Sequence, residues 1–237
     1  MKLKNKKILI TGGAIRIGRE ICRIFAAHGS KIILHYNSSE SAAKQLFKEL
    51  GGTDKGHSLT KGDLTCQSYI SNLISSLGQI DILINNASIF DNKPLDLEDL
   101  QTARQQYEIN FWAPLTLMRQ FKKQCFGDGL IINILDQRIY SLNSNTGSYL
   151  LSKKSLANAT RLAALQWAPE VRVNGIAPGI VIPPVHLPNS KMQKSIDSIP
   201  MKKTTPVKEI ANACIFLAEN DSITGEIITL DGGQHLV

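Results

Sequence analysis

Short runs of β-branched and other apolar residues alternate along the chain with longer stretches in which apolar residues recur at helical spacing. The short runs predict strands at residues 7–11, 31–36, 57–61, 81–86, 130–135, 171–177 and 226–230. The longer stretches predict helices near residues 16–29, 41–50, 97–126, 148–168 and 207–219. Strands that alternate with helices in this way form βαβ units. We therefore expect an α/β fold with a doubly wound, seven-stranded parallel sheet and helices on both faces.

The length and composition of the chain suit one domain. It has 237 residues, of which 43% are hydrophobic, and it contains no internal repeat, low-complexity tract or linker. The longest irregular piece, residues 179–203, contains prolines and lies between the sixth strand and the last helix. Because ligands bind beyond the carboxyl ends of such strands, we expect a substrate loop there, although an ordinary surface loop fits the same composition.

Charge and cysteine usage exclude several classes of protein. The net charge of +7 comes largely from scattered lysines, which favours a solvated basic face over a nucleic-acid site. The four cysteines are far apart and the five histidines are dispersed, so we expect neither a disulfide framework nor a metal site. No apolar run approaches membrane-spanning length, and the sequence has no targeting segment, so we expect a cytoplasmic protein without a membrane partner.

A glycine-rich stretch, "TGGAIRIG" at 11–18, follows the first predicted strand and opens the first helix. Gly12 and Gly13 allow a tight turn, and Gly18 allows close packing of the helix. The amides at the start of that helix face an anion. In this context the stretch predicts a dinucleotide site rather than a plain turn.

The end of the second predicted strand bears on which dinucleotide is bound. NAD sites usually have an acidic residue there to bind the ribose 2′-hydroxyl, whereas this chain has Asn37, Ser38 and Ser39. These side chains can donate hydrogen bonds to a 2′-phosphate, and Arg16 adds a positive charge, which favours NADP(H). They can equally cap the following helix. Asp63, in "GDL" at 62–64, is a candidate acceptor for the adenine amino group or another cap.

A second constellation lies in "LDQRIYSLNSNTGSYLLSK" at 135–153. Tyr149 and Lys153 are four residues apart, on one face of a predicted helix, and Asp136 stands thirteen residues before Tyr149. A buried ammonium beside a phenol favours the phenolate, so we expect the pKa of Tyr149 to be brought down toward neutrality and Tyr149 to act as a general acid. Lys153 can also hydrogen-bond the nicotinamide ribose.

Together these features resemble the short-chain dehydrogenase/reductase family over essentially the whole chain. The matching motifs are "TGGAIRIG", "DL" at 63–64, "NNAS" at 85–88, Asn110 in "YEINFW", "YLLSK", "PG" at 178–179 and "DGG" at 231–233. The resemblance implies a single Rossmann-type domain over residues 1–237, a homotetramer, catalytic roles for Tyr149 and Lys153, and a proton-relay water anchored by Asn110. It places cofactor contacts at Gly12, Arg16, Ile17, Gly18, Asn37, Ser38, Ser39, Asp63, Leu64, Asn86, Ala87, Ser88, Tyr149, Lys153, Pro178 and Gly179.

Asp136 departs from the family, which has a serine at that position. A hydroxyl hydrogen-bonds a carbonyl oxygen as charge develops on it, whereas an ionised carboxylate repels that oxygen. Asp136 therefore suits a substrate that presents N–H donors or is reduced at a C=N bond, whose nitrogen must gain a proton. We expect Asp136 to be catalytic, because a carboxylate beside a phenol can hold and relay that proton. The alternative is that Asp136 marks a damaged site.

Further departures resemble the pteridine reductase branch of the family, which includes dihydromonapterin reductases. Arg16, Ser88, Phe90, Asp136 and Tyr149 match that branch, in which a pterin lies between the nicotinamide and the phenylalanine. A flat ring favours an aromatic face, and its amino groups need acceptors. The resemblance implies NADPH-dependent reduction of a dihydropteridine of the dihydromonapterin, dihydrobiopterin or dihydrofolate type.

Two other functions remain open. One is a carbonyl reductase, for example of a 3-oxoacyl thioester, which the missing serine argues against. The other is a non-catalytic, NADP(H)-binding regulatory protein in which Asp136 is a sign of decay.

Overall fold

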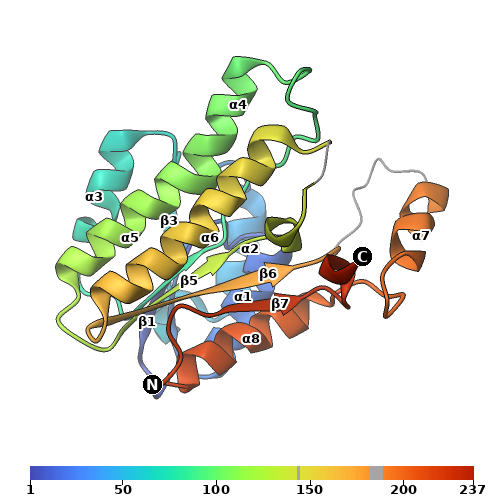
Figure 1. The fold of residues 1–237 in the computed structure, drawn as a ribbon. Helices are drawn as coiled ribbons and strands as arrows, with labels where there is room; N and C mark the ends of the chain where they lie inside the picture. The colour runs from blue at the N-terminus through green and yellow to red at the C-terminus, as the bar shows by residue number, and fades with distance from the viewer. Residues whose placement is uncertain (143–144, 182–188) are drawn as a thin grey trace.

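The structure, a computed structural model, describes residues 1–142, 145–181 and 189–237. Seven strands form one sheet in the order β3-β2-β1-β4-β5-β6-β7, and every neighbouring pair is parallel (Figure 1). The strands are β1 (Lys7–Ile10), β2 (Lys31–Tyr36), β3 (Ser58–Lys61), β4 (Ile82–Asn85), β5 (Gly129–Ile134), β6 (Val171–Pro178) and β7 (Ile227–Leu230). This confirms the predicted doubly wound α/β fold and all seven predicted strands.

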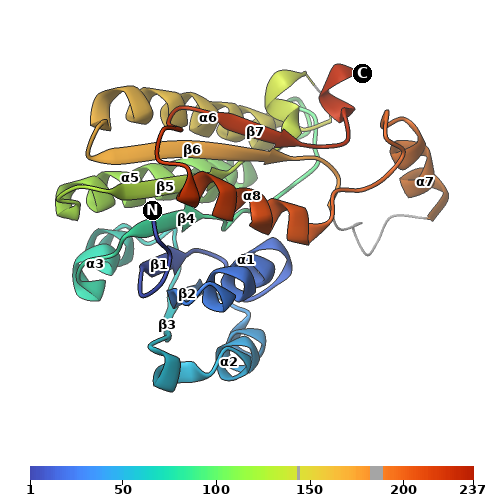
Figure 2. The ribbon, with the colours of Figure 1, turned by 90° about the horizontal axis from the view of Figure 1, so that it is seen from below.

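Helices cover both faces of the sheet (Figures 1 and 2). One layer contains α1 (Arg16–Ala27), α2 (Glu40–Glu49) and α8 (Val207–Glu219). The other contains α3 (Gln67–Leu77), α5 (Ala113–Gln124) and α6 (Gly147–Trp167), with α4 (Leu100–Tyr107) beside α6. The shorter elements are η1 (Gly52–Lys55), η2 (Glu108–Trp112), η3 (Gln137–Tyr140), α7 (Asn189–Asp197) and η4 (Gln234–Leu236).

Each helical layer packs on its own hydrophobic core. Successive side chains of a strand point to opposite faces, so Ile8 and Ile10 of β1 join the cluster with α1 and α8, whereas Leu9 joins the cluster with α3 and α5. Apolar side chains on both faces explain why the strands read as nearly continuous apolar runs.

The sequence missed one helix of the main layers. The segment of α3 carries Ile70, Leu73 and Ile74 at helical spacing, and all three are buried against the sheet. Its polar residues are mostly serines, and Cys66 at its start makes no side-chain capping bond. Packing on the sheet therefore supplies the stability that local signals do not.

Two other predicted segments differ from the expectation. The helix expected near 97–126 is divided into α4, a π-helical turn at η2, and α5. The segment 179–203, expected to be irregular, includes the helix α7. Residues 182–188 of that segment lie outside the described part of the chain.

The sheet order also determines where a ligand site lies. From β1 the chain winds outward through β2 and β3, then returns to continue on the other side at β4. The loops after β1 and β4 therefore separate onto opposite faces and leave a crevice at the carboxyl ends. The predicted motifs follow the ends of strands on this edge of the sheet.

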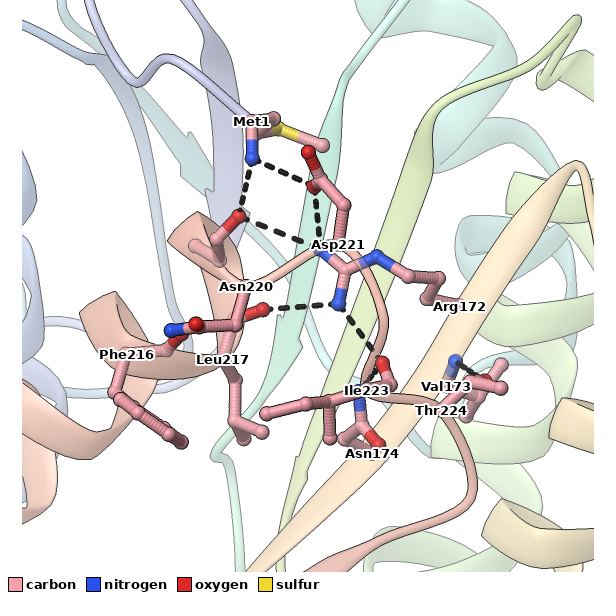
Figure 3. Close-up of polar contacts among 11 residues, drawn as sticks. Met1, Arg172, Val173, Asn174, Phe216, Leu217, Asn220, Asp221, Ile223 and Thr224 are labelled. Atoms are coloured by element: carbon pink, nitrogen blue, oxygen red, sulfur yellow. Dashed lines mark hydrogen bonds and ion pairs between the residues drawn. The ribbon is translucent and has the colours of Figure 1, made fainter.

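At the amino ends of the strands, Arg172 at the start of β6 joins the sheet to α8 (Figure 3). Its guanidinium donates to the carbonyl oxygens of Leu217 and Ile223, each over 2.9 Å, and to that of Ala218 over 3.3 Å. The bonds to Leu217 and Ala218 satisfy carbonyl groups at the end of α8 that have no partner within the helix, and the bond to Ile223 holds the loop that follows it. None of the described helices is both long and apolar enough to cross a membrane.

Candidate active site

A cavity of about 670 Å³ opens at the carboxyl ends of the strands. Its size is within the range of small-molecule and cofactor sites. Of the residues predicted to bind cofactor or substrate or to act in catalysis, the cavity is lined by Gly12, Arg16, Ile17, Gly18, Asn37, Ser38, Ser39, Leu64, Asn86, Ala87, Ser88, Phe90, Asp136, Tyr149, Lys153, Pro178 and Gly179. Asp63 and Asn110 are not part of this lining.

The glycine-rich loop has a conformation that requires glycine at two positions. Gly12 has a φ of +62°, and a Cβ on Gly18 would collide with the Gly12 carbonyl oxygen and the Asn86 side chain. Asn86 fixes the loop from β4 by donating to the carbonyl oxygens of Thr11 and Gly12 over 2.9 and 3.0 Å. Arg16, at φ +51°, is a non-glycine residue in the left-handed region.

His35 is a buried contact of this loop that the sequence did not point to. Its Nε2 lies 3.1 Å from the Gly62 carbonyl oxygen, and the Gly12 amide lies 3.5 Å from its Nδ1. Burial lowers the pKa of His35 to about 4, so the ring is neutral at physiological pH. The proton then belongs on Nε2, which donates to Gly62 and links the end of β2 to the end of β3.

The residues proposed to bind a 2′-phosphate lie together after β2. Asn37, Ser38 and Ser39 line the cavity, and the Ser39 side chain makes no capping bond to α2. Asp63 behaves differently, because its Oδ1 accepts a hydrogen bond from the Thr65 amide over 2.8 Å. The structure thus favours a local structural role for Asp63, and its adenine contact stays a prediction.

The Tyr149 hydroxyl donates to Asp136 Oδ2 over 2.8 Å, so the two predicted catalytic residues meet in the cavity. Asp136 follows β5 and caps η3, where its Oδ1 accepts from the Arg138 amide over 2.9 Å. Arg138 Nη1 also lies 3.1 Å from Oδ2. Lys153, one turn after Tyr149 on α6, donates to the Ile134 carbonyl oxygen over 3.0 Å.

The expected lowering of the Tyr149 pKa is wrong for this arrangement. Burial and the neighbouring Asp136 raise the pKa of Tyr149 well above its usual value, against the opposing effects of Arg138 and Arg16. The carboxylate is in direct contact with the hydroxyl, whereas Lys153 Nζ lies 6.0 Å from the Tyr149 ring centroid. Burial also lowers the pKa of Lys153 to about 8.

Phe90 lies beside this group. Its ring is 50% exposed and stands edge-on to the Tyr149 ring, with the centroids 4.6 Å apart. The Arg138 guanidinium carbon is 5.6 Å from the Phe90 centroid. An exposed aromatic face next to a hydrogen-bonded carboxylate and phenol suits a flat, polar-edged ring.

Asn110 holds the segment that leads to Phe90. Its Oδ1 accepts from the Ser88 hydroxyl over 2.9 Å and from the Ile89 amide over 3.0 Å, and its Nδ2 donates to the Ile89 carbonyl oxygen over 2.9 Å. Asn110 is fully buried in the π-helical turn η2, a feature often found at functional sites. Its predicted role in a proton relay stays a prediction.

Arg138 is the other site residue that sequence reasoning missed. Only its position two residues after Asp136 signalled it, because an Asp that caps a short helix turns the following residues back toward its own carboxylate.

In the described part of the chain no three His, Cys, Asp or Glu side chains are placed to hold a metal ion. The expectation of no metal therefore stays a prediction.

Comparisons with known proteins find relatives that match almost the whole chain. A family model described as "Enoyl-(Acyl carrier protein) reductase" matches residues 13–235. The 7alpha-hydroxysteroid dehydrogenase of Escherichia coli (strain K12) is 30% identical to the chain, over 98% of this chain and 95% of that protein. The "Glucose and ribitol dehydrogenase homolog 2" of Arabidopsis thaliana is 29% identical, over 98% of this chain and 86% of that protein.

Two solved structures are similar over the whole chain. One is the FolM alternative dihydrofolate reductase 1 from Brucella canis in complex with NADP, with 33% identity and a TM-score of 0.92 over 100% of this chain and 96% of that one. The corresponding protein from Brucella suis, also in complex with NADP, has 32% identity and a TM-score of 0.93 over 100% and 97%. The chain belongs to the short-chain dehydrogenase/reductase family of oxidoreductases.

Proposed function

We propose that this protein is an NADPH-dependent pteridine reductase that converts a dihydropteridine to its tetrahydro form. The observation that carries the proposal is the carboxylate of Asp136, which accepts the Tyr149 hydrogen bond inside the cavity and lies next to an exposed aromatic ring. A carboxylate there opposes an oxyanion but accepts hydrogen bonds from the amino and N–H groups of a pterin. The likeness to the two Brucella reductases supports the same substrate class.

The residues of the cavity fit NADP(H) as the cofactor. Gly18, which has no side chain, lets the start of α1 pack closely against the loop at Gly12, and the amides at the start of that helix suit the pyrophosphate. Asn37, Ser38 and Ser39 offer donors for the 2′-phosphate, and Lys153 for the nicotinamide ribose. When bound, NADPH supplies a hydride for the carbon of the C=N bond.

The chain's own residues supply the proton. Because the pKa of Tyr149 is raised, its hydroxyl stays protonated at physiological pH and holds a proton for the substrate nitrogen. Asp136 orients that hydroxyl through Oδ2 and accepts hydrogen bonds from the ring edge. Asn110 holds Ser88 and, through the same segment, Phe90, against which the pterin ring stacks. Arg16 and Ser88 complete the polar edge of the site.

The decisive experiment is NADPH oxidation by the purified protein with dihydropteridines, dihydrofolate and an acetoacetyl thioester as alternative substrates. We expect turnover of a dihydropteridine, and we expect Asp136→Ser and Tyr149→Phe to abolish it. The matched controls are Asp54→Ser and Tyr107→Phe, which lie outside the cavity lining and should keep the wild-type rate. A wild type inactive on pterins, together with carbonyl reduction by Asp136→Ser, would instead make the protein a carbonyl reductase scaffold.

We also propose a cytoplasmic homotetramer with a substrate loop at 179–203. The four cysteines are free, as suits a reducing compartment. Large apolar side chains remain exposed on α6, which is consistent with association between chains. Size-exclusion chromatography with light scattering tests the oligomeric state, and exchange of the loop between relatives tests its part in substrate choice.

A further inference from the structure

Arg138 connects two parts of the site that come from different strands. Asp136 follows β5, and Phe90 lies in the segment after β4. Asp136 Oδ2 lies 3.1 Å from Arg138 Nη1, and the Phe90 ring centroid lies 5.6 Å from the guanidinium carbon. One side chain therefore contacts both the acid and the aromatic face of the site.

The contacts with Asp136 are complementary. The Arg138 amide donates to Oδ1 over 2.9 Å, and the side chain approaches Oδ2, the atom that also accepts from Tyr149 over 2.8 Å. Both carboxylate oxygens are thus held, which fixes the plane of the carboxylate and its alignment with the phenol. The backbone contact comes from the capping turn itself, whereas the side-chain contact depends on arginine being present.

The contact with Phe90 uses the flat shape of the guanidinium. A guanidinium near an aromatic face is attracted by the ring electrons, and its planar form suits stacking in a way that an ammonium does not. Phe90 is half exposed, so few packing contacts restrict its ring. Arg138 supplies one of the contacts that do, and Tyr149 supplies another.

The simpler reading is that Arg138 only stabilises the η3 turn. The turn, however, is capped by the Asp136 side chain through the backbone amide, which any residue at position 138 except proline retains. Arg138 is also among the residues that line the cavity. Its position is therefore better explained by what it does to the site than by the turn.

We propose that Arg138 is a positioning residue of the reductase site, which holds the Asp136 carboxylate and the Phe90 ring in the arrangement that receives a flat, amino-bearing heterocycle. This inference rests on the proposed pterin reductase function. Arg138 also opposes the rise of the Tyr149 pKa, so its loss would leave the Tyr149 hydroxyl a weaker acid. The inference predicts effects on both substrate binding and proton transfer, with the cofactor site intact.

The test compares Arg138→Met and Arg138→Lys with the wild type and with Arg104→Met, an exposed arginine on α4 outside the cavity lining. Three quantities are measured: steady-state kcat and KM for the dihydropteridine, NADPH affinity by fluorescence, and affinity for an oxidised pterin in the presence of NADP⁺. For Arg138→Met we expect pterin affinity and kcat/KM to fall about 10- to 100-fold, as for loss of a charged hydrogen bond. NADPH affinity should stay within about twofold, because no proposed cofactor contact is removed.

Rescue separates positioning from folding. Arg138→Lys restores the charge without the planar fork and should recover only part of the loss, whereas millimolar guanidinium added to Arg138→Ala should raise kcat/KM by supplying the missing group. Unchanged pterin affinity and kcat/KM in a folded Arg138→Met overturn the inference and leave the proposed function standing. If the wild type neither binds nor reduces a pterin, the proposed function fails and the inference fails with it. Equal loss of NADPH and pterin binding assigns Arg138 a purely structural role.

Discussion

At the scale of single residues, the site is governed by where one carboxylate lies. Asp136 is in contact with the Tyr149 hydroxyl, and Lys153 is turned toward the Ile134 carbonyl oxygen. Burial, together with this neighbouring carboxylate, raises the pKa of the phenol, so Tyr149 is held as a protonated donor. Under the proposed function, the acid opposes an oxyanion and Tyr149 gives its proton to the substrate nitrogen.

Lys153 carries a cost in stability that depends on pH. Its pKa falls from 10.5 in the unfolded chain to about 8 in the folded one, because burial disfavours the ammonium. Below pH 8 both states are protonated and the full cost is present. Between pH 8 and 10.5 the folded state loses its proton while the unfolded state keeps it, so the free energy of unfolding rises with pH in this window.

Replacing this lysine should therefore stabilise the protein at neutral pH. Lys153→Met should raise the free energy of unfolding by roughly 2 kcal/mol at pH 7, after allowance for the lost bond to Ile134. Denaturant unfolding at several pH values measures the effect, and the gain should shrink between pH 8 and 10.5. The exposed Lys208→Met serves as control. A gain of the same size at every pH would contradict the assigned cause.

At the scale of elements, the sequence predicted the strands and helices whose pattern of apolar residues is strong. Apolar runs predicted the inner strands, because a sheet covered on both faces needs apolar side chains on both, whereas the edge strand β3 has only one apolar residue, Leu59. The helix α3 escaped notice since its serine-rich segment has weak local signals and depends on packing. The π-helical turn at Asn110 was likewise not predicted, because the Asn110 side chain there bonds to Ser88 and Ile89, which are distant in the sequence.

The site residues divide in the same way. Those belonging to a spaced motif, such as Gly18 in the loop or Tyr149 and Lys153 on one helix face, could be predicted and do line the cavity. Arg138 and His35 belong to no motif, because their contacts depend on how a turn and a strand end come together in three dimensions. The pKa of Tyr149 was wrongly predicted for a related reason: spacing gives neighbours but not distances.

The junction between β2 and α2 offers a test of cofactor choice. Ser38 is exposed and lines the cavity where the 2′-phosphate is proposed to bind. An arginine there can form a two-pronged, charge-assisted contact with a phosphate, so Ser38→Arg should tighten NADPH binding about tenfold and leave NADH binding unchanged. Fluorescence titration with both cofactors measures this difference. Ser41→Arg, one turn along on exposed surface, is the control. An equal change for both cofactors would argue against a 2′-phosphate site at Ser38.

At the scale of the whole molecule, the two ends of the parallel strands have different roles. The carboxyl ends of the strands carry the cavity, whereas at their other ends Arg172 of β6 is hydrogen-bonded to the end of α8 (Figure 3). The residues of α6 that line the cavity are Tyr149 and Lys153, near the start of the helix. Substitutions further along its outer face can therefore be used to separate assembly from cofactor binding.

The proposed tetramer makes a prediction about that face. Leu162 and Leu165 are 55% and 80% exposed and lie three residues apart on α6, so they share one side of the helix. Burying two carboxylates against a second chain is costly, so Leu162→Glu combined with Leu165→Glu should dissociate the oligomer, as measured by light scattering. NADPH affinity should be retained. Phe126→Glu, at a 91% exposed position in the turn before β5, is the control and should leave the mass unchanged. A monomeric wild type would show that the tetramer prediction is wrong, and a tetrameric double variant would place the interface away from this face of α6.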